Sequence, residues 1–158
     1  MSNYSLKEVY TSVDHYKLFS LRCPADELDQ CIASLQSENI RVVNIGKELA
    51  AYIDTIEDYK YLSMDIYDFT KKLLEINKSK IAGQGNDVLA IYNVGILLEP
   101  RLELNAVQLL KEFSKSAALI IIWENETDWP GRLNWPTQKQ HFFFDFSDKI
   151  LKELHNAI

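Results

Sequence analysis

The feature that most constrains the fold is a set of short apolar runs separated by amphipathic stretches. The clearest run, AALIIIW, covers residues 117–123 and contains no charged or polar side chain except the indole N–H of its last residue. A second run, VLAIYNV, begins at Val88. Continuous apolar runs of this length are typical of strands covered on both faces, which lie in parallel sheets between two layers of helices. The sequence therefore predicts a three-layer α/β domain.

Helical segments separate the predicted strands, and the gaps are long enough for the crossover connections that parallel strands require. We therefore expect one domain over residues 1–158 with a mainly parallel, five-stranded sheet. Helices are predicted from Pro24, over 47–53 and 58–77, from an Asn105 cap to 115, and from a Ser147 cap with Ile150, Leu151 and Leu154 facing inward. Strands are predicted over 16–23, 40–45, 88–94, 117–123 and 141–146.

Composition and charge limit the possible partners. The net charge is −6, and no run of Lys and Arg is present, so we do not expect direct binding to a phosphate backbone. The longest apolar run is too short to cross a bilayer, and the N-terminal MSNYSLKEVY lacks the pattern of a signal peptide. These features predict a cytoplasmic protein that binds neither nucleic acid nor membrane.

The two cysteines, Cys23 and Cys31, are eight residues apart, which matches no metal or redox motif. In a cytoplasmic protein we expect both to be reduced and partly buried. Cys23 precedes a predicted helix N-terminus, where a thiol pKa can be lowered, so it is the best-placed nucleophile. However, Asp26 and Glu27 oppose that effect, and no paired histidine is identifiable. The sequence favours a plain buried cysteine over a catalytic one.

The turn after the first predicted strand lacks the residues of a phosphate-binding loop. Such a loop, G-x-x-x-x-G-K-[ST], uses glycines to bring backbone N–H groups to the phosphates and a lysine to add charge. Here residues 23–27 are CPADE, so a proline removes a donor and two carboxylates repel phosphate. The strand that should end in a magnesium-binding acid ends in Tyr92 and Asn93. We therefore expect no cofactor-binding or catalytic residue at these two positions.

One pair of residues imitates part of the missing motif. Gly46 and Lys47 follow the second predicted strand, but Glu48 occupies the place of the hydroxyl residue and no upstream glycine is present. We interpret this pair as the start of a helix with a solvated lysine. The three histidines, His15, His141 and His155, form no ligand spacing, so no metal site is expected.

The segment VLAIYNVGILLEPRLELNAVQLLKEFSKSAALIIIWENE, followed by WPGRLNW, resembles the small P-loop-containing protein of bacteriophage-exclusion (BREX-type) defence operons. The resemblance covers residues 88–135 best and 16–54 more weakly. It implies a degenerate P-loop NTPase fold, with the strands, numbered in chain order, arranged 5-1-4-3-2. It also implies a scaffold role in an antiviral or DNA-associated complex. The residues that carry the resemblance are Asn93, Leu97, Leu98, Pro100, Leu102, Leu109, Leu110, Ser114 and Trp123.

A polar loop over 124–140 holds the candidate interaction residues. Trp129 and Trp135 each precede a proline, and Arg132 lies between them. Tryptophan and arginine are enriched at the energetic centres of protein interfaces, and a loop of this length is often functional. We predict that these three residues bind other proteins of a complex. The alternative, that both rings fold back over the edge of the sheet, stays open.

The sequence leaves several functions in competition. The first is a non-catalytic interaction or scaffold subunit that has lost its nucleotide site. The second is a nucleotide-binding ATPase subunit with an unconventional phosphate loop, completed by a neighbour. A small enzyme that uses Cys23 and an immunity-type protein that binds a neighbouring effector are further possibilities.

Overall fold

The structure, a computed structural model, describes residues 4–80, 85–124, 132–136, 141–146 and 150–154. Its centre is a six-stranded sheet with the order β2-β4-β5-β1-β8, in which β3 pairs with β4 beside this path. All pairs are parallel except β3 with β4. The strands of this sheet are β1 (Leu18–Arg22), β2 (Val42–Asn44), β3 (Ser79–Lys80), β4 (Asp87–Tyr92), β5 (Ala118–Trp123) and β8 (Leu151–Glu153).

The central strands are buried on both faces, as their composition predicts. Every residue of β5 is buried, and β1 and β4 flank it in parallel register. Because side chains alternate along a strand, Leu119 and Ile121 enter one hydrophobic core, whereas Ile120 and Ile122 enter another on the opposite face. The sheet therefore separates two cores.

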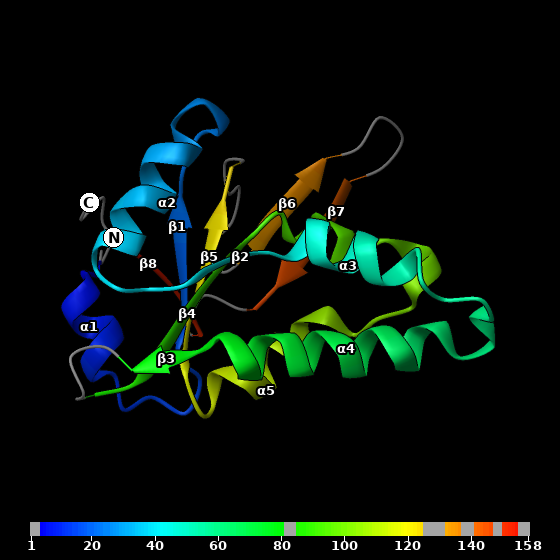
Figure 1. The fold of residues 1–158 in the computed structure, drawn as a ribbon. Coiled ribbons are helices and arrows are strands. Elements are labelled where there is room, and N and C mark those ends of the chain that lie inside the picture. The colour runs from blue at the N-terminus through cyan, green and yellow to red at the C-terminus, as the bar shows by residue number, and fades with distance from the viewer. Residues whose placement is uncertain (1–3, 81–84, 125–131, 137–140, 147–149, 155–158) are drawn as a thin grey trace.

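Helices cover both faces, which completes the three layers (Figure 1). The helices α1 and α2 pack on one face. The other face is covered by α3, α4, α5 and a two-stranded antiparallel hairpin of β6 and β7. The elements of these two outer layers are α1 (Leu6–Thr11), α2 (Leu28–Ser37), α3 (Ile45–Ile53), α4 (Leu62–Asn77), α5 (Ala106–Ser114), β6 (Arg132–Pro136) and β7 (His141–Asp145). Short 3-10 turns complete the chain: η1 (Ala25–Glu27), η2 (Tyr59–Tyr61), η3 (Val94–Leu98) and η4 (Pro100–Leu102).

Polar side chains fix where several helices begin. The Asn105 carboxamide accepts a hydrogen bond from the Gln108 backbone N–H at 3.2 Å, which confirms the predicted cap of α5. At the start of α1, Ser5 and Glu8 form a reciprocal capping box. The hydrogen bonds that Ser5 donates to the Glu8 carboxylate lower the pKa of that side chain. These caps satisfy backbone donors that have no partner within the helix.

The structure confirms an α/β domain with a mainly parallel sheet, and β1, β5, β4 and β2 lie in the predicted relative order. The predicted fifth strand is present, but its predicted position in the sheet is wrong. Residues 141–145 form β7, which pairs with β6 in the hairpin and not with β1. The physical reason is the short connection of four residues between β6 and β7, which allows an antiparallel partner but no parallel crossover. The loop predicted over 124–140 accordingly contains β6.

The predicted final helix is also wrong, because residues 151–153 form strand β8 beside β1. Leu151 and Leu154 are buried as expected, but in the cores on opposite faces of the sheet. Two residues three positions apart point to opposite faces of a strand, whereas a helix would place them on the same side. Their apolar spacing fits both structures, and pairing with β1 decides between them.

No helix within the described parts of the chain is long and apolar enough to span a membrane.

The hairpin is part of the core, so its inward face should contribute strongly to stability. Phe144 is fully buried, and its ring contacts those of Trp123 and Phe146, each at a centroid distance of 5.9 Å. We expect Phe144→Ala to lower the free energy of unfolding by about 3–5 kcal/mol. The matched control is Asp145→Ala on the outward face, which breaks an exposed ion pair with Arg132 at 3.3 Å and should cost about 1 kcal/mol or less. Chemical denaturation measures both, and equal losses would contradict this packing.

Candidate functional site

The position most suited to a ligand is the edge where β1 and β5 end. In open parallel sheets, ligands bind outside the carboxyl ends of the strands, where neighbouring strands continue to opposite faces. Here β1 and β5 are adjacent, and they end at the same edge (Figure 1). The chain leaves β1 for α2 on one face, and after β5 it enters the hairpin on the other. The candidate site is therefore this edge together with the ends of β4 and β2.

The turn after β1 is closed by a covalent bond. Cys23 is fully buried and forms a disulfide with Cys31 of α2, with 6.8 Å between their Cα atoms. The Cys23 backbone N–H donates to the Trp123 carbonyl at 2.8 Å, and Pro24 precedes the 3-10 turn η1. In a phosphate-binding loop, backbone N–H groups of this turn face the ligand. Here the turn is fixed against its own helix and the neighbouring strand.

The disulfide corrects the prediction of two reduced cysteines. The signal was present in the sequence, because Cys31 lies on the apolar stripe of α2 and Cys23 ends a buried strand, so both enter the same core. Neither cysteine is free, so Cys23 has no thiol to act as the nucleophile considered above. Disulfides are rare in cytosolic proteins, and the cytoplasmic location stays a prediction.

The ends of β2 and β4 are joined by a pair of asparagines. Asn44 is the last residue of β2 and pairs in register with Tyr92, the last residue of β4. Asn93 follows Tyr92 directly. The Asn93 Nδ2 donates to the Asn44 Oδ1 at 2.9 Å, and the same oxygen accepts from the Lys47 backbone N–H at 3.0 Å. Asn93 adopts the left-handed conformation, with φ of 56°, which Asn tolerates better than most residues. We call this group the asparagine clamp.

The asparagine clamp explains the Gly46-Lys47 pair. A Cβ atom on Gly46 would lie 2.2 Å from the Asn93 Nδ2, so the glycine makes room for the asparagine side chain. The Lys47 N–H, one of the donors that a phosphate would need at this helix start, is already bonded to Asn44. These contacts support the interpretation of the pair as a helix start.

A small cavity lies at the carboxyl edge between β1, β5 and β8. It has a volume of about 90 Å³ and is lined by polar and apolar groups from three strands and the hairpin. Ser20 and Trp123 contribute to its wall and are nearly completely buried. The Trp123 Nε1 is buried and donates no hydrogen bond within the described parts of the chain. The full lining is Ser20, Arg22, Trp123, Leu133, Glu153 and Leu154.

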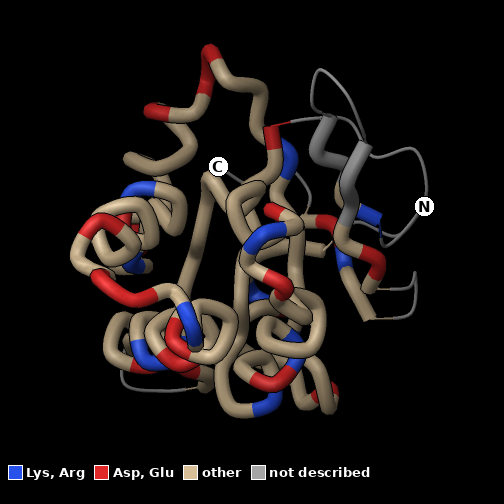
Figure 2. The backbone as a smooth tube through the Cα atoms, turned by 90° about the vertical axis from the view of Figure 1, so that its right-hand side faces the viewer, with Lys and Arg blue, Asp and Glu red and all other residues tan. Residues whose placement is uncertain are grey.

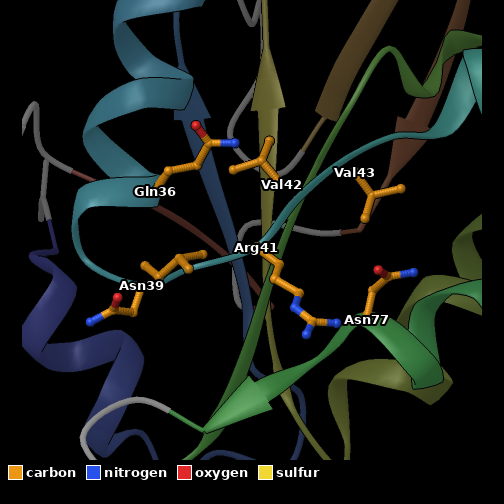
Figure 3. Close-up of a pocket in the computed structure, with 7 residues that line it drawn as sticks. Gln36, Asn39, Arg41, Val42, Val43 and Asn77 are labelled. Atoms are coloured by element: carbon orange, nitrogen blue, oxygen red, sulfur yellow. The ribbon is translucent and has the colours of Figure 1, made fainter.

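A second, open groove lies beside β2, the outermost strand on the side of the sheet away from β8 (Figure 3). Gln36 and Asn39 line it from the end of α2, and Arg41 and Asn77 face the same hollow from below β2 in that view. The Asn77 Nδ2 already donates to the Leu73 carbonyl at 2.8 Å. The strand at this edge is only three residues long, and short edge strands resist the addition of a further strand.

Two of the three predicted interaction residues, Arg132 and Trp135, belong to β6. Trp129 lies outside the described residues. Trp135 belongs to β6, where its backbone pairs with Phe142. The Arg132 guanidinium pairs with the Asp145 carboxylate at 3.3 Å, and both side chains are partly exposed. Trp123 is buried in the core, as predicted. The role of Trp129, Arg132 and Trp135 in binding stays a prediction.

Over residues 4–80, 85–124 and the shorter described segments that follow, no three His, Cys, Asp or Glu side chains lie close enough together to hold a metal ion. Comparison of the chain with protein-family models, with curated proteins and with solved structures gives no match.

The asparagine clamp predicts coupling between Gly46 and Asn93. We expect Gly46→Ala alone to lower the free energy of unfolding by about 1–3 kcal/mol, because the new methyl group displaces the Asn93 side chain. In an Asn93→Gly background, which keeps the left-handed conformation accessible, the side-chain clash is gone and only the residue 93 carbonyl oxygen remains close, 3.1 Å from the new Cβ, so the same substitution should cost less, about 1 kcal/mol or below. A double-mutant cycle from chemical denaturation measures the coupling. Additive effects would show that the two residues do not touch.

The disulfide predicts a defined thiol count. Denatured, unreduced protein should show no reactive thiol, and the same sample after treatment with a dithiol should show two per chain, since Cys23 and Cys31 are the only cysteines. We expect Cys23→Ala with Cys31→Ala to lower the free energy of unfolding by about 2–3 kcal/mol, as for a short closed loop. Two reactive thiols in the unreduced sample would contradict the pairing.

Proposed function

We propose that this protein is a non-catalytic interaction or scaffold subunit built on an ATPase-like α/β fold. One observation carries the proposal: the edge at which such sheets bind nucleotides is occupied by the chain's own contacts. The Cys23–Cys31 disulfide holds the turn after β1. The Asn44–Asn93 hydrogen bond holds the ends of β2 and β4. Two backbone donors at this edge, the Cys23 and Lys47 N–H groups, are bonded to the protein itself.

The size of the cavity that the described residues form at this edge supports the same conclusion. The cavity between β1, β5 and β8 has a volume of about 90 Å³, whereas pockets for cofactors and drug-sized ligands have about 300–1,000 Å³. A cavity of this size has room for several water molecules, at about 10–15 Å³ each. It has no room for a nucleotide.

The resemblance of residues 88–135 to the small P-loop protein of BREX-type operons supports a role in an antiphage defence complex. In that proposal the protein binds other subunits and leaves nucleotide hydrolysis to them. The net charge of −6 favours protein partners over nucleic acid, because like charges repel.

The proposal is tested by thermal unfolding of the full chain with MgATP and MgADP. We expect no change in Tm. A nucleotide present at about 100 times its Kd would stabilise the folded state by about 2.7 kcal/mol, which corresponds to a rise of roughly 5–10 °C for a domain of this size. A P-loop ATPase treated in parallel supplies the positive control. A saturable rise in Tm would favour the alternative, an ATPase subunit with an unconventional phosphate loop.

A further inference from the structure

Exposed apolar side chains gather where α3 leads into α4. Tyr59, Tyr61 and Met64 are 58%, 57% and 62% exposed. They are three of the five large hydrophobic residues that are exposed in the described parts of the chain; the other two, Val13 and Ile76, lie elsewhere. Single exposed apolar residues are ordinary, but a group of them marks a binding surface. This end of the molecule faces the viewer in Figure 2.

Two of these residues, Tyr61 and Met64, also line an open groove. It has a volume of about 400 Å³ and is lined by five residues from η2 and the first turns of α4. The groove is wide open to solvent, so it is a surface for docking and not an enclosed ligand cleft. We call it the tyrosine groove; its lining is Lys60, Tyr61, Ser63, Met64 and Tyr67.

The wall of the tyrosine groove is held in place from behind. Asp58 caps η2 by accepting a hydrogen bond from the Lys60 N–H at 2.9 Å. The Ser63 hydroxyl donates to the Glu103 carbonyl at 3.1 Å, and Ile66, on the inner side of α4, is fully buried in the core. The exposed rings therefore stand on a fixed support, which lowers the entropic cost of binding a partner.

The segment that carries the tyrosine groove is acidic, although the charged residue in the lining itself is Lys60 and two lysines, Lys71 and Lys72, follow on α4. Residues 54–68 contain five carboxylates and one lysine, a net charge of −4 out of −6 for the chain. Most of these carboxylates are exposed. Complementary charge sets partner choice and association rate more than affinity, so the apolar groove supplies the contact and the acids select the partner. The carboxylates belong to Asp54, Glu57, Asp58, Asp65 and Asp68.

The groove already accommodates a cation on one of its rings. The Lys60 ammonium lies 5.4 Å from the centroid of the Tyr61 ring, which is within the range of a cation–π contact. A planar guanidinium stacks on tyrosine better than an ammonium does and also binds carboxylates through two hydrogen bonds. Arginine and tyrosine are, in addition, enriched at the centres of protein interfaces.

We propose that the tyrosine groove docks a basic, arginine-bearing segment of a partner protein. The inference rests on the proposed interaction function and names the chemistry of the partner. An arginine of that segment displaces the Lys60 ammonium from the Tyr61 ring and others pair with the surrounding carboxylates, while an apolar residue beside them contacts Met64. A nucleic acid does not fit, because the same carboxylates repel its phosphates.

The test is a titration of the isotope-labelled full chain with a synthetic peptide of alternating arginine and leucine, followed by backbone amide NMR. We expect saturable shifts at residues 57–68, weakened by high salt. A peptide of alternating glutamate and leucine should cause none. Shifts confined to other parts of the chain, or equal binding of both peptides, would overturn the proposal.

Two matched double variants separate the groove from general stickiness. Tyr61→Ser with Met64→Ser removes two exposed apolar side chains from the groove and should weaken peptide binding about tenfold or more. Val13→Ser with Ile76→Ser removes two exposed apolar side chains elsewhere and should leave binding unchanged. All four side chains are exposed, so Tm should change little in either variant. Equal loss of binding in both would overturn the proposal.

A charge variant tests the selecting role of the acids. Asp65→Lys with Asp68→Lys should abolish binding of the arginine peptide. The variant, like the unsubstituted protein, should show no change in Tm with MgATP. Failure of the peptide to bind the unsubstituted protein, or unchanged binding to the charge variant, overturns the docking proposal; without a response to MgATP it leaves the interaction function intact. A response to MgATP overturns the interaction function, whatever the peptide does.

Discussion

The parallel pairing of β1, β5 and β4 is the constraint on which the rest of the structure depends. The six residues of β5 are buried on both faces, so apolar cover is needed on both sides of the sheet. The cover consists of α1 and α2 on one side and of α3, α4, α5 and a hairpin on the other. Because parallel strands also require crossovers, the same constraint brings the turns after β1, β2 and β4 to one edge. The candidate site is a consequence of that arrangement.

At this edge the chain makes contacts with itself. A disulfide holds the first turn, and a shared asparagine oxygen joins the second and third. These bonds restrict the turns at the carboxyl ends of the strands. The recognition surface that we infer lies instead at the α3–α4 end, on rings that project from a capped turn. In this view, the sheet edge provides rigidity and the helical layer provides the partner contact.

Much of the fold is predictable from local patterns. The Asn105 cap, the longer helices and four apolar strands all follow from periodicity and from residues that act within a few positions of one another. These strands are β1, β2, β4 and β5. The missing phosphate loop is equally local, because it is read from five consecutive residues. The last part of the chain is harder to predict. Three residues of β8 carry too little pattern to distinguish a strand from a helix, and β6 is disguised by polar residues and a proline.

The sequence by itself determined the class of fold and the absence of a phosphate-loop motif after β1, because both depend on residue type and short spacing. Only the tertiary structure decided which contacts form at the ends of the strands. Cys23 and Cys31 become partners because α2 folds back over the end of β1. Asn44 and Asn93 are 49 positions apart in the sequence, and they meet because β2 pairs with β4. The tyrosine groove arises in the same way, since burial of the inner face of α4 fixes which side chains remain outside. Contacts between distant segments depend on how the layers pack, and no local pattern encodes that packing.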